Sequence, residues 1–361
     1  MRTRILTTCE ELAALEADWR GLAAESGAPF FWGPDWAIPF WEHLRPRGRL
    51  HCLAAFEAGC LVGLAPLMVV PIRGLRCLQF LGNPLNDSNG FVAAPGARQS
   101  VCQELLGCLA ADRSRWDILE AFVLDGASAI GHAAGPLRVT GLDSEPAPVL
   151  PLTGGWGQYV SLLPPERHRS FHYLERRFFR EHPVEFRVST DADDIRRNLA
   201  ECERQRLDGW RQRGRLHELP PVSRSPQFAH FLAATAYRLA RTGDFWLAEL
   251  RARGLLVASA YYLRSGPRLL KYMQSWDYAY HAHSPGTVLD WMVIRRATEE
   301  GIKLVDFGRG DEAYKYRFGA VPHRLDNALL TPDSFRGRIA VAIWRGGARL
   351  RAVWENWRRP R

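Results

Sequence analysis

The stretch 303–319 combines an apolar run with a dense set of charged and phenolic side chains. The run ends in a turn that contains Gly308 and Gly310, and seven positions then hold Asp311, Glu312, Tyr314, Lys315, Tyr316 and Arg317. A buried strand that ends in so many polar groups is typical of a binding site. Lysine occurs only three times among 48 basic residues, so a lysine here indicates a point charge rather than the planar fork of arginine.

These side chains have the types required by acyl transfer to an amine or hydroxyl, the reaction that the family resemblance of this segment implies. The reaction needs a base, a donor to the developing oxyanion and close positioning. Asp306, at the end of the strand, and Asp311, beyond the turn, are candidate bases. Lys315 and Arg317 could hold an anionic group, the arginine in bidentate fashion, and Tyr314 is a further candidate for substrate binding. The alternative is an internal salt-bridge network that fixes the glycine turn.

A second candidate site precedes the helix predicted over 287–300. Pro285 fixes its own φ, Gly286 lets the backbone approach a ligand closely, and Ser284 or Thr287 can cap the helix. The free N–H groups of the first turn then face an anion. Acyltransferases of the GNAT type cradle the pyrophosphate of an acyl-CoA with a strand, a loop and a helix in this order. The alternative is an ordinary Ser-Pro-Gly helix start.

A family resemblance joins these two sites. Residues 306–318 are similar, nearly position for position, to the signature D-F-x-R-G-D-E-x-Y-K-x-R-[WF] of the CelD-type acetyltransferases, a GNAT family linked to cellulose and exopolysaccharide biosynthesis and related to the FemABX aminoacyl transferases. The segment 81–89 resembles the family's G-x-P-L-x-D-x-N element, which makes Asp87 a catalytic candidate and Asn89 a substrate-binding candidate. Turn chemistry is the alternative for both residues. Ala282 departs from the family, which often has an arginine there.

The resemblance implies tandem GNAT-like domains and acyl-CoA, for example acetyl-CoA, as co-substrate, but it supplies no proven catalytic residue. The order of predicted elements supports the tandem, because strand-helix-helix-strand-strand-strand-helix-strand occurs twice. We therefore predict a mixed α/β fold with two GNAT-like domains. The predicted parts are an N-terminal domain (1–150), a connector with a basic helix (151–183), a C-terminal domain (184–332) and a basic helical tail (333–361).

The composition narrows the classes of function. A chain of 361 residues suits two domains, and its seven cysteines form no CxxC pair, which predicts reduced thiols and no metal site. The N-terminus lacks a secretory pattern, so a cytoplasmic protein is expected. The net charge of +9 is concentrated in 336–361, where eight arginines and one glutamate give 8 − 1 = +7. The remaining +2 argues against a nucleic-acid partner.

The tail combines arginines with apolar residues, which suits an interfacial helix on an anionic membrane. Gly346 and Gly347 interrupt the pattern and predict two short helices. The alternative is that Ile339, Ala342 and Ile343 cover the second domain. The sequence leaves three functions open: an acyl-CoA-dependent N- or O-acyltransferase acting on an exopolysaccharide or envelope precursor or an amino sugar, a FemABX-like transferase using charged tRNA, and a non-catalytic scaffold in polysaccharide biosynthesis.

Overall fold

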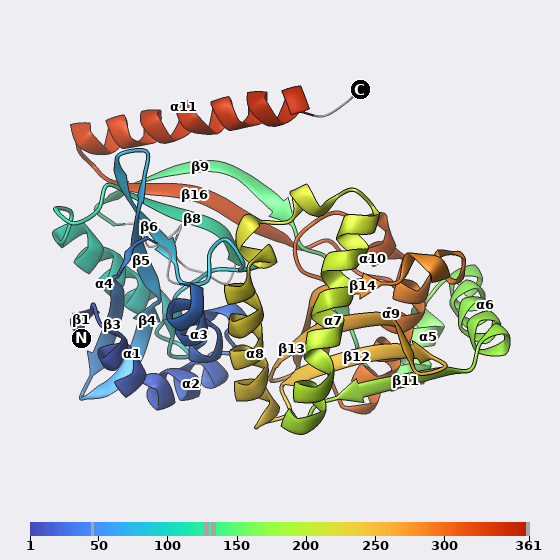
Figure 1. Cartoon of the computed structure of the whole chain (residues 1–361). Helices are drawn as coiled ribbons and strands as arrows, with labels where there is room; N and C mark the ends of the chain where they lie inside the picture. Colours follow the sequence, from blue (N-terminus) through green and yellow to red (C-terminus); the bar gives the residue numbers. More distant parts are fainter. Residues whose placement is uncertain (45–46, 126–129, 131–134, 359–361) are drawn as a thin grey trace. The chain divides into compact units, whose positions relative to one another are not determined.

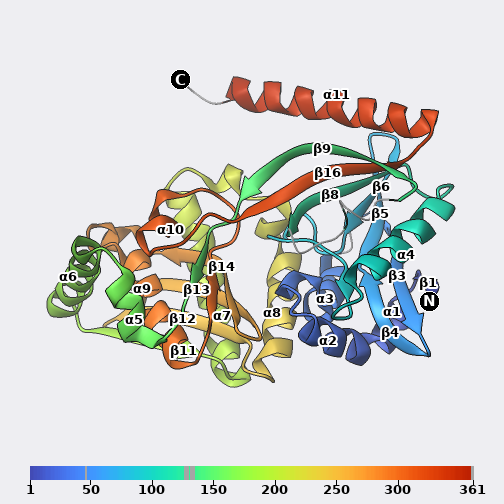
Figure 2. The same ribbon diagram turned by 180° about the vertical axis from the view of Figure 1, so that it is seen from behind.

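The computed structural model describes residues 1–44, 47–125, 130 and 135–358, with side chains of the last helix described up to Gly346 (Figures 1 and 2). The chain divides into two compact units. The first comprises residues 1–41, 45–145 and 325–361, and the second comprises 42–44 and 146–324. No helix in the described ranges is both long and apolar enough to cross a lipid bilayer.

The first unit is built on two sheets, with strand orders β1-β3-β4-β7 and β2-β5-β6-β8-β16-β9. Helix α4 carries buried Val101, Leu105 and Leu109 into the core formed with these strands. The elements of this unit are β1 (Arg2–Leu6), α1 (Cys9–Ala14), α2 (Glu16–Glu25), the 3-10 helix η1 (Phe30–Trp32), α3 (Pro34–Leu44), β2 (Arg49–Leu50), β3 (Cys52–Glu57), β4 (Cys60–Ala65), β5 (Leu67–Ile72), β6 (Leu75–Phe80), β7 (Val92–Ala93), α4 (Arg98–Ala111), β8 (Ile118–Asp125), β9 (Leu137–Pro146), β16 (Arg324–Pro332) and α11 (Phe335–Arg358).

The second unit has one six-stranded sheet in the order β10-β15-β14-β13-β12-β11. Helix α7 lies on one face of this sheet and α9 on the other (Figures 1 and 2). The elements are β10 (Val149–Pro151), α5 (Gly155–Leu162), α6 (Pro165–Glu181), β11 (Val184–Ser189), α7 (Ala192–Gln212), η2 (Leu216–Glu218), η3 (Pro221–Arg224), α8 (Pro226–Ala240), β12 (Phe245–Ala252), β13 (Leu255–Ser265), β14 (Arg268–Trp276), η4 (Tyr278–His283), α9 (Pro285–Glu299), β15 (Leu304–Asp306) and α10 (Ala313–Arg317).

Local sequence explains where the main helices of the second unit begin. Asp191 precedes α7 and its side chain accepts a hydrogen bond from the Asp194 amide. Ser225 caps α8 in the same way, with Pro226 at the first helical position. Each cap satisfies an amide that has no partner inside the helix.

The same connectivity occurs in both units, as the repeated sequence pattern predicts. In each unit a series of antiparallel strands is followed by one parallel pair, β6 with β8 and β14 with β15. Each parallel pair is joined through a crossover helix, α4 in the first unit and α9 in the second, because parallel strands cannot be linked by a tight turn. The predicted mixed α/β class with two GNAT-like domains is confirmed at the level of fold.

Three strands of the two six-stranded sheets, β9, β10 and β16, were not predicted from the sequence. β16, which follows the second unit in the chain, pairs antiparallel with β8 of the first unit. β10, which follows the first unit, pairs antiparallel with β15 of the second. Residues 325–332 therefore group with the first unit, whereas the predicted boundaries place them in the C-terminal domain.

The tail forms one helix, α11, so the prediction of two short helices is wrong. A glycine in a helix interior costs only about 1 kcal/mol relative to alanine, which packing elsewhere can offset. Ala340 is buried against Leu75, Cys77, Ile118 and Leu329 of the first unit. Trp344 donates a hydrogen bond from Nε1 to Glu120 Oε1 at 2.6 Å. The start of the helix thus covers the first unit rather than the second.

Candidate functional site

A β-bulge in β14 brings polar side chains together in the interior beneath α9. The register between β13 and β14 shifts at Tyr261/Tyr262, with Tyr262 opposite Lys271 and Tyr261 opposite Met273. Residues three apart on a regular strand point to opposite faces. The extra residue of the bulge reverses that alternation, so Lys271 and Gln274 both point toward α9.

Asp290, on the buried side of α9, joins these side chains. Lys271 Nζ lies 2.6 Å from Asp290 Oδ2 and 3.0 Å from Gln274 Oε1. Tyr262 Oη and Gln274 Nε2 donate to Asp290 Oδ1 at 2.7 and 3.0 Å. Lys271 is 5% exposed and Asp290 is 1% exposed. An ion pair this deep is tolerated only because hydrogen bonds satisfy its remaining donors and acceptors.

Burial governs how this cluster holds its protons. Desolvation lowers the pKa of the Lys271 ammonium, and the charge of Asp290 opposes that shift. Burial and Asp290 together raise the pKa of Tyr262 well above its ordinary value. Burial likewise raises the pKa of Tyr314, whose ring lies 4.8 Å from Lys271 Nζ. Both phenols are therefore proton donors at neutral pH.

The edge of β14 becomes free beside this cluster. β15 pairs with β14 only from Arg268 to Leu270, whereas β14 continues to Trp276. In the described part of the chain, no strand pairs with this edge beyond Leu270. Unpaired backbone N–H and C=O groups on a strand edge can hydrogen-bond an extended ligand.

The predicted Ser284–Thr287 turn lies at the end of this free edge. Ser284 adopts φ 49° and ψ 51°, and it makes no side-chain cap, contrary to the prediction. Its carbonyl instead accepts hydrogen bonds from the amides of Thr287 and Val288. Fewer first-turn amides are thus available to an anion than the sequence suggested.

Gly286 packs directly on β14. A Cβ at this position would lie 3.1 Å from Gln274 Oε1 and 3.3 Å from the Trp276 ring, and the Gly286 carbonyl accepts from Gln274 Nε2 at 3.0 Å. The close approach of helix and strand therefore explains the glycine, whether or not a ligand binds there.

Lys315 and Asp306 fix the glycine turn. Lys315 is 2% exposed, and its ammonium donates to the carbonyls of residues 308, 309 and 310 at 3.1, 2.6 and 3.0 Å. Asp306 accepts from Arg268 at 2.6 Å and from the Gly308 amide at 2.8 Å. Lys315 also pairs with Glu312 at 2.9 Å. These contacts are those of the salt-bridge alternative, in which both side chains hold the turn.

The other predicted residues separate into two groups. Asp311 and Arg317 are exposed, and Asp311 accepts a hydrogen bond from Tyr316. The Tyr314 ring lies 4.8 Å from Lys271 Nζ, and the Lys315 ammonium acts on Lys271 by charge repulsion. The predicted cofactor residue Gly286 contacts Gln274 of the same cluster.

Asp87 and Asn89 lie in the first unit. Asn89 is 1% exposed, donates to Asn83 Oδ1 and to the Phe122 carbonyl, and accepts from Asn86 at 2.7 Å. These contacts tie the loop to β8 and agree with the turn alternative. Asp87 is half-buried on the same loop.

A cavity of about 250 Å³ opens at the carboxyl end of β14, beside Trp276. Its charged lining residues are three acids, Glu201, Asp208 and Asp277, and one base, Arg204. The Asp277 side chain also caps η4. The excess of carboxylates suits an amine or a polyhydroxylated acceptor.

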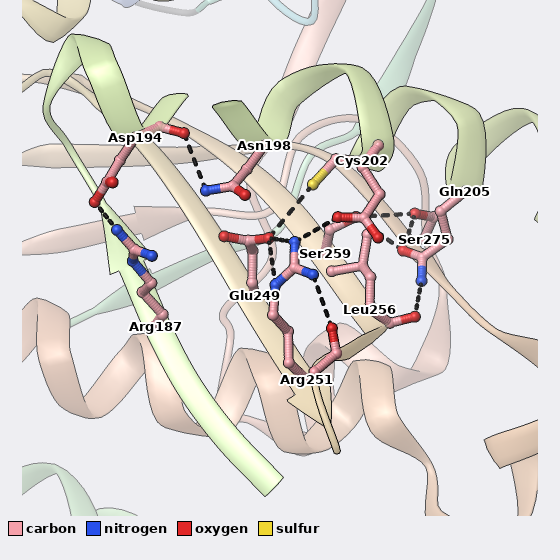
Figure 3. A network of polar contacts seen from close by, with 12 residues as sticks. Arg187, Asp194, Asn198, Cys202, Gln205, Glu249, Arg251, Leu256, Ser259 and Ser275 are labelled. Carbon is pink, nitrogen blue, oxygen red and sulfur yellow. Dashed lines mark hydrogen bonds and ion pairs between the residues drawn. The ribbon is translucent and has the colours of Figure 1, made fainter. Parts of the chain in front are cut away.

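A buried polar network lies between α7 and the sheet, on the face opposite α9 (Figure 3). Gln205 Oε1 accepts from Ser259 and Ser275 at 3.0 Å each, and its amide nitrogen donates to the Leu256 carbonyl at 2.9 Å. Glu249 is fully buried and pairs with Arg251 at 2.6 Å. This network fixes α7, whose Gln205 also lines the cavity.

Sequence reasoning missed Lys271, Gln274 and Asp290. The scarcity of lysine pointed to Lys271 as much as to Lys315. Asp290, an acid on the apolar face of a predicted helix, was a further signal. The bulge that brings them together has no signature in the sequence.

Comparisons with known proteins identify the second unit more closely. Residues 166–316 match the family model "Acetyltransferase (GNAT) domain". A search of curated proteins finds no match. Among solved structures, FemX aligns over 91% of this chain and 97% of its own with a TM-score of 0.64 and 11% identity.

Two further structures share the fold over both units. The C-terminal domain of a putative lysylphosphatidylglycerol synthetase from Agrobacterium fabrum has a TM-score of 0.59 and 13% identity, covering 92% of this chain and 96% of that one. L-PGS from Bacillus licheniformis has a TM-score of 0.57 and 12% identity, and the alignment covers 91% of this chain and 95% of L-PGS. Residues 166–316 thus resemble a GNAT acetyltransferase domain, and the chain shares its overall fold with FemX and these synthetases.

Proposed function

We propose that the second unit transfers an acyl group from acyl-CoA to an amine or hydroxyl of an exopolysaccharide or cell-envelope precursor or an amino sugar, as a CelD-type acetyltransferase. The observation that carries this proposal is the free edge of β14 beyond Leu270, which leads to the α9 turn at Gly286, inside the segment that matches a GNAT domain. The edge offers hydrogen bonds to an extended pantetheine chain, and the helix N-terminus attracts its pyrophosphate.

In this proposal the reaction takes place between the free edge and the cavity at Trp276. The amides of the β14 edge would donate to the thioester oxygen and stabilise the oxyanion. Tyr314 keeps its proton, so its hydroxyl could donate to the developing charge on the oxyanion or the leaving thiolate. The carboxylates of the cavity, Asp208 and Asp277 among them, would hold the acceptor and take its proton.

Lys271 and Asp290 take a positioning role here. Their pair holds Gln274, which in turn holds the Gly286 carbonyl at 3.0 Å. A substitution of Lys271 or Asp290 would therefore affect the donor turn through the Gln274 side chain. Asp311 stays an exposed candidate base, and Arg317 stays an exposed candidate for binding the acceptor.

A FemABX-like aminoacyl transferase is the second candidate function. Its support is the likeness of the whole chain to FemX, at a TM-score of 0.64. At 11% identity this likeness extends to the fold alone. The two functions differ in the donor, which is an acyl-CoA in one and a charged tRNA in the other.

Thermal unfolding of the full chain with acetyl-CoA distinguishes them. A ligand at 100 times its Kd stabilises by about 2.7 kcal/mol, a shift of several degrees in Tm. We expect acetyl-CoA and longer acyl-CoAs to raise the Tm and free adenosine to leave it unchanged. If no CoA thioester raises it while transfer from aminoacyl-tRNA is detected, the second function is correct. No response to either donor would support a non-catalytic scaffold.

A further inference from the structure

A second cavity, of about 360 Å³, lies between α7 and α8 in the second unit. Its walls include apolar side chains from both helices: Leu199, Leu207, Ala229, Ala233 and Tyr237. It shares only Arg204 with the lining of the cavity at Trp276. A volume of this size is within the range of small-molecule sites, roughly 300–1,000 Å³.

Arg206 gives this apolar cavity a buried polar group. It is 3% exposed, lines the cavity and stacks over the Phe228 ring at 5.3 Å. Its Nε and Nη2 bind Glu203 at 3.0 and 2.9 Å, and Nη2 also donates to the Ser223 carbonyl at 2.6 Å. Nη1 is buried and has no acceptor among the described residues.

A buried guanidinium nitrogen without an acceptor is costly, because its water has been removed and nothing replaces it. Arginine is also the side chain best suited to bind a carboxylate. The single carboxylate that lines the cavity, Glu203, already accepts hydrogen bonds from three other donors: Nε and Nη2 of Arg206, and the Tyr261 hydroxyl at 2.8 Å.

The charge of the lining favours an anion. Arg196, Arg204 and Arg206 face the cavity against one glutamate. The Arg196 guanidinium lies over the Tyr237 ring, 5.3 Å from its centre. A ligand that fits both features has an apolar body between the two helices and an anionic head at the arginines.

We propose that the α7/α8 cavity binds a medium-chain acyl carboxylate, with its carboxylate at the guanidinium of Arg206 and its chain between Leu199, Leu207 and Ala233. This site is separate from the proposed donor turn and does not depend on acyl transfer. It gives the chain a means of sensing or holding an acyl chain apart from the thioester it is proposed to use.

Calorimetric titration of the full chain without CoA tests the site. The probe is sodium decanoate, with 1-decanol as the same chain without charge and acetate as the head without a chain. We expect decanoate to bind at least about tenfold more tightly than either comparator. Equal affinities for decanoate and decanol would overturn the proposal, since partition into an apolar surface would then explain binding.

Two variants on α8 provide matched controls. Ala233→Phe fills part of the cavity and keeps the Arg206 side chain, and we expect it to weaken decanoate binding at least about tenfold. Ala234→Phe adds the same group at a neighbouring half-buried position outside the lining and should leave the affinity within about twofold. Similar affinities for both variants would place the ligand elsewhere.

A third variant tests the head group. Glu203→Gln/Arg206→Gln removes both charges together, so that no unpaired charge stays buried. This variant should bind decanoate and decanol alike. A retained preference for decanoate would show that the arginine is not the carboxylate's partner. Acetyl-CoA stabilisation, measured on the same variants, should not change, so failure of this proposal is distinguishable from failure of the proposed function.

Discussion

Removing the charge of Lys271 should destabilise the protein in a strongly pH-dependent way. Lys271→Met leaves Asp290 buried at 1% exposure with two neutral donors, Tyr262 and Gln274. Losing one partner of a buried pair typically costs 3–5 kcal/mol. Protonation of the Asp290 carboxylate in the variant would remove the buried charge and so reduce this cost.

The cost of protonation sets the magnitude. At pH 7 it is about 4 kcal/mol for an aspartate with the ordinary pKa of about 3.9, and at pH 5 it is about 1.5 kcal/mol. In the wild type the Lys271 ammonium, 2.6 Å away, compensates the charge of the Asp290 carboxylate. The loss of unfolding free energy in Lys271→Met should therefore fall by about 2.5 kcal/mol between pH 7 and pH 5.

Urea unfolding at the two pH values measures this difference. The matched control is Lys303→Met, which removes an exposed lysine and should stay within about 0.5 kcal/mol of wild type. Lys271→Met/Asp290→Asn removes both charges and keeps an acceptor for Tyr262, so it should recover more than half of the loss. A loss in Lys271→Met that is the same at pH 5 and pH 7, or no larger than that of Lys303→Met, would refute this account.

Three further outcomes are expected. Gly286→Ala should weaken acetyl-CoA binding and lower the Tm slightly, because its Cβ would crowd β14. The control Gly107→Ala, with open space in α4, should stabilise the protein by up to about 1 kcal/mol. Equal affinity of the two variants for acetyl-CoA would exclude the turn as the donor site. Lys315→Met should lose stability and turnover together, since three carbonyls lose their donor; turnover lost at unchanged urea midpoint would instead restore a catalytic lysine. The full-length protein should co-sediment with anionic vesicles at low salt. The double variant Ile339→Ser/Ile343→Ser, at positions 43% and 41% exposed, should abolish co-sedimentation without changing the Tm. If the wild type does not co-sediment, α11 is only a structural cover of the first unit.

The tail prediction needs point substitutions rather than truncation. Ala340 and Trp344 pack on the first unit, so a protein without α11 would expose part of a core. The apolar residues that the sequence assigned to the covered side, Ile339 and Ile343, are exposed instead. They lie one helical turn apart on the outer side of α11, together with Phe335, which is 78% exposed.

The order of elements could be predicted from the sequence because each depends on local patterns. Alternating apolar residues predict strands such as β12 and β13, and caps such as Asp191 and Ser225 mark helix starts. The repeat of that order was sufficient to predict two related units. The signature at 306–318 likewise pointed to the segment that matches a GNAT domain.

Tertiary structure alone decided which polar residues form the site. Lys315 and Asp306 have the composition of catalytic residues, yet their hydrogen bonds fix a turn, and hydrogen-bond partners cannot be read from spacing. Lys271 and Gln274 share a face only because of a bulge set by pairing with β13. Strands β10 and β16 also depend on long-range pairing, with β15 and β8 respectively, which local propensity does not encode. The sequence determined most of the helices and strands and their repeated order, and contacts between residues far apart in the chain determined the chemistry each side chain can perform.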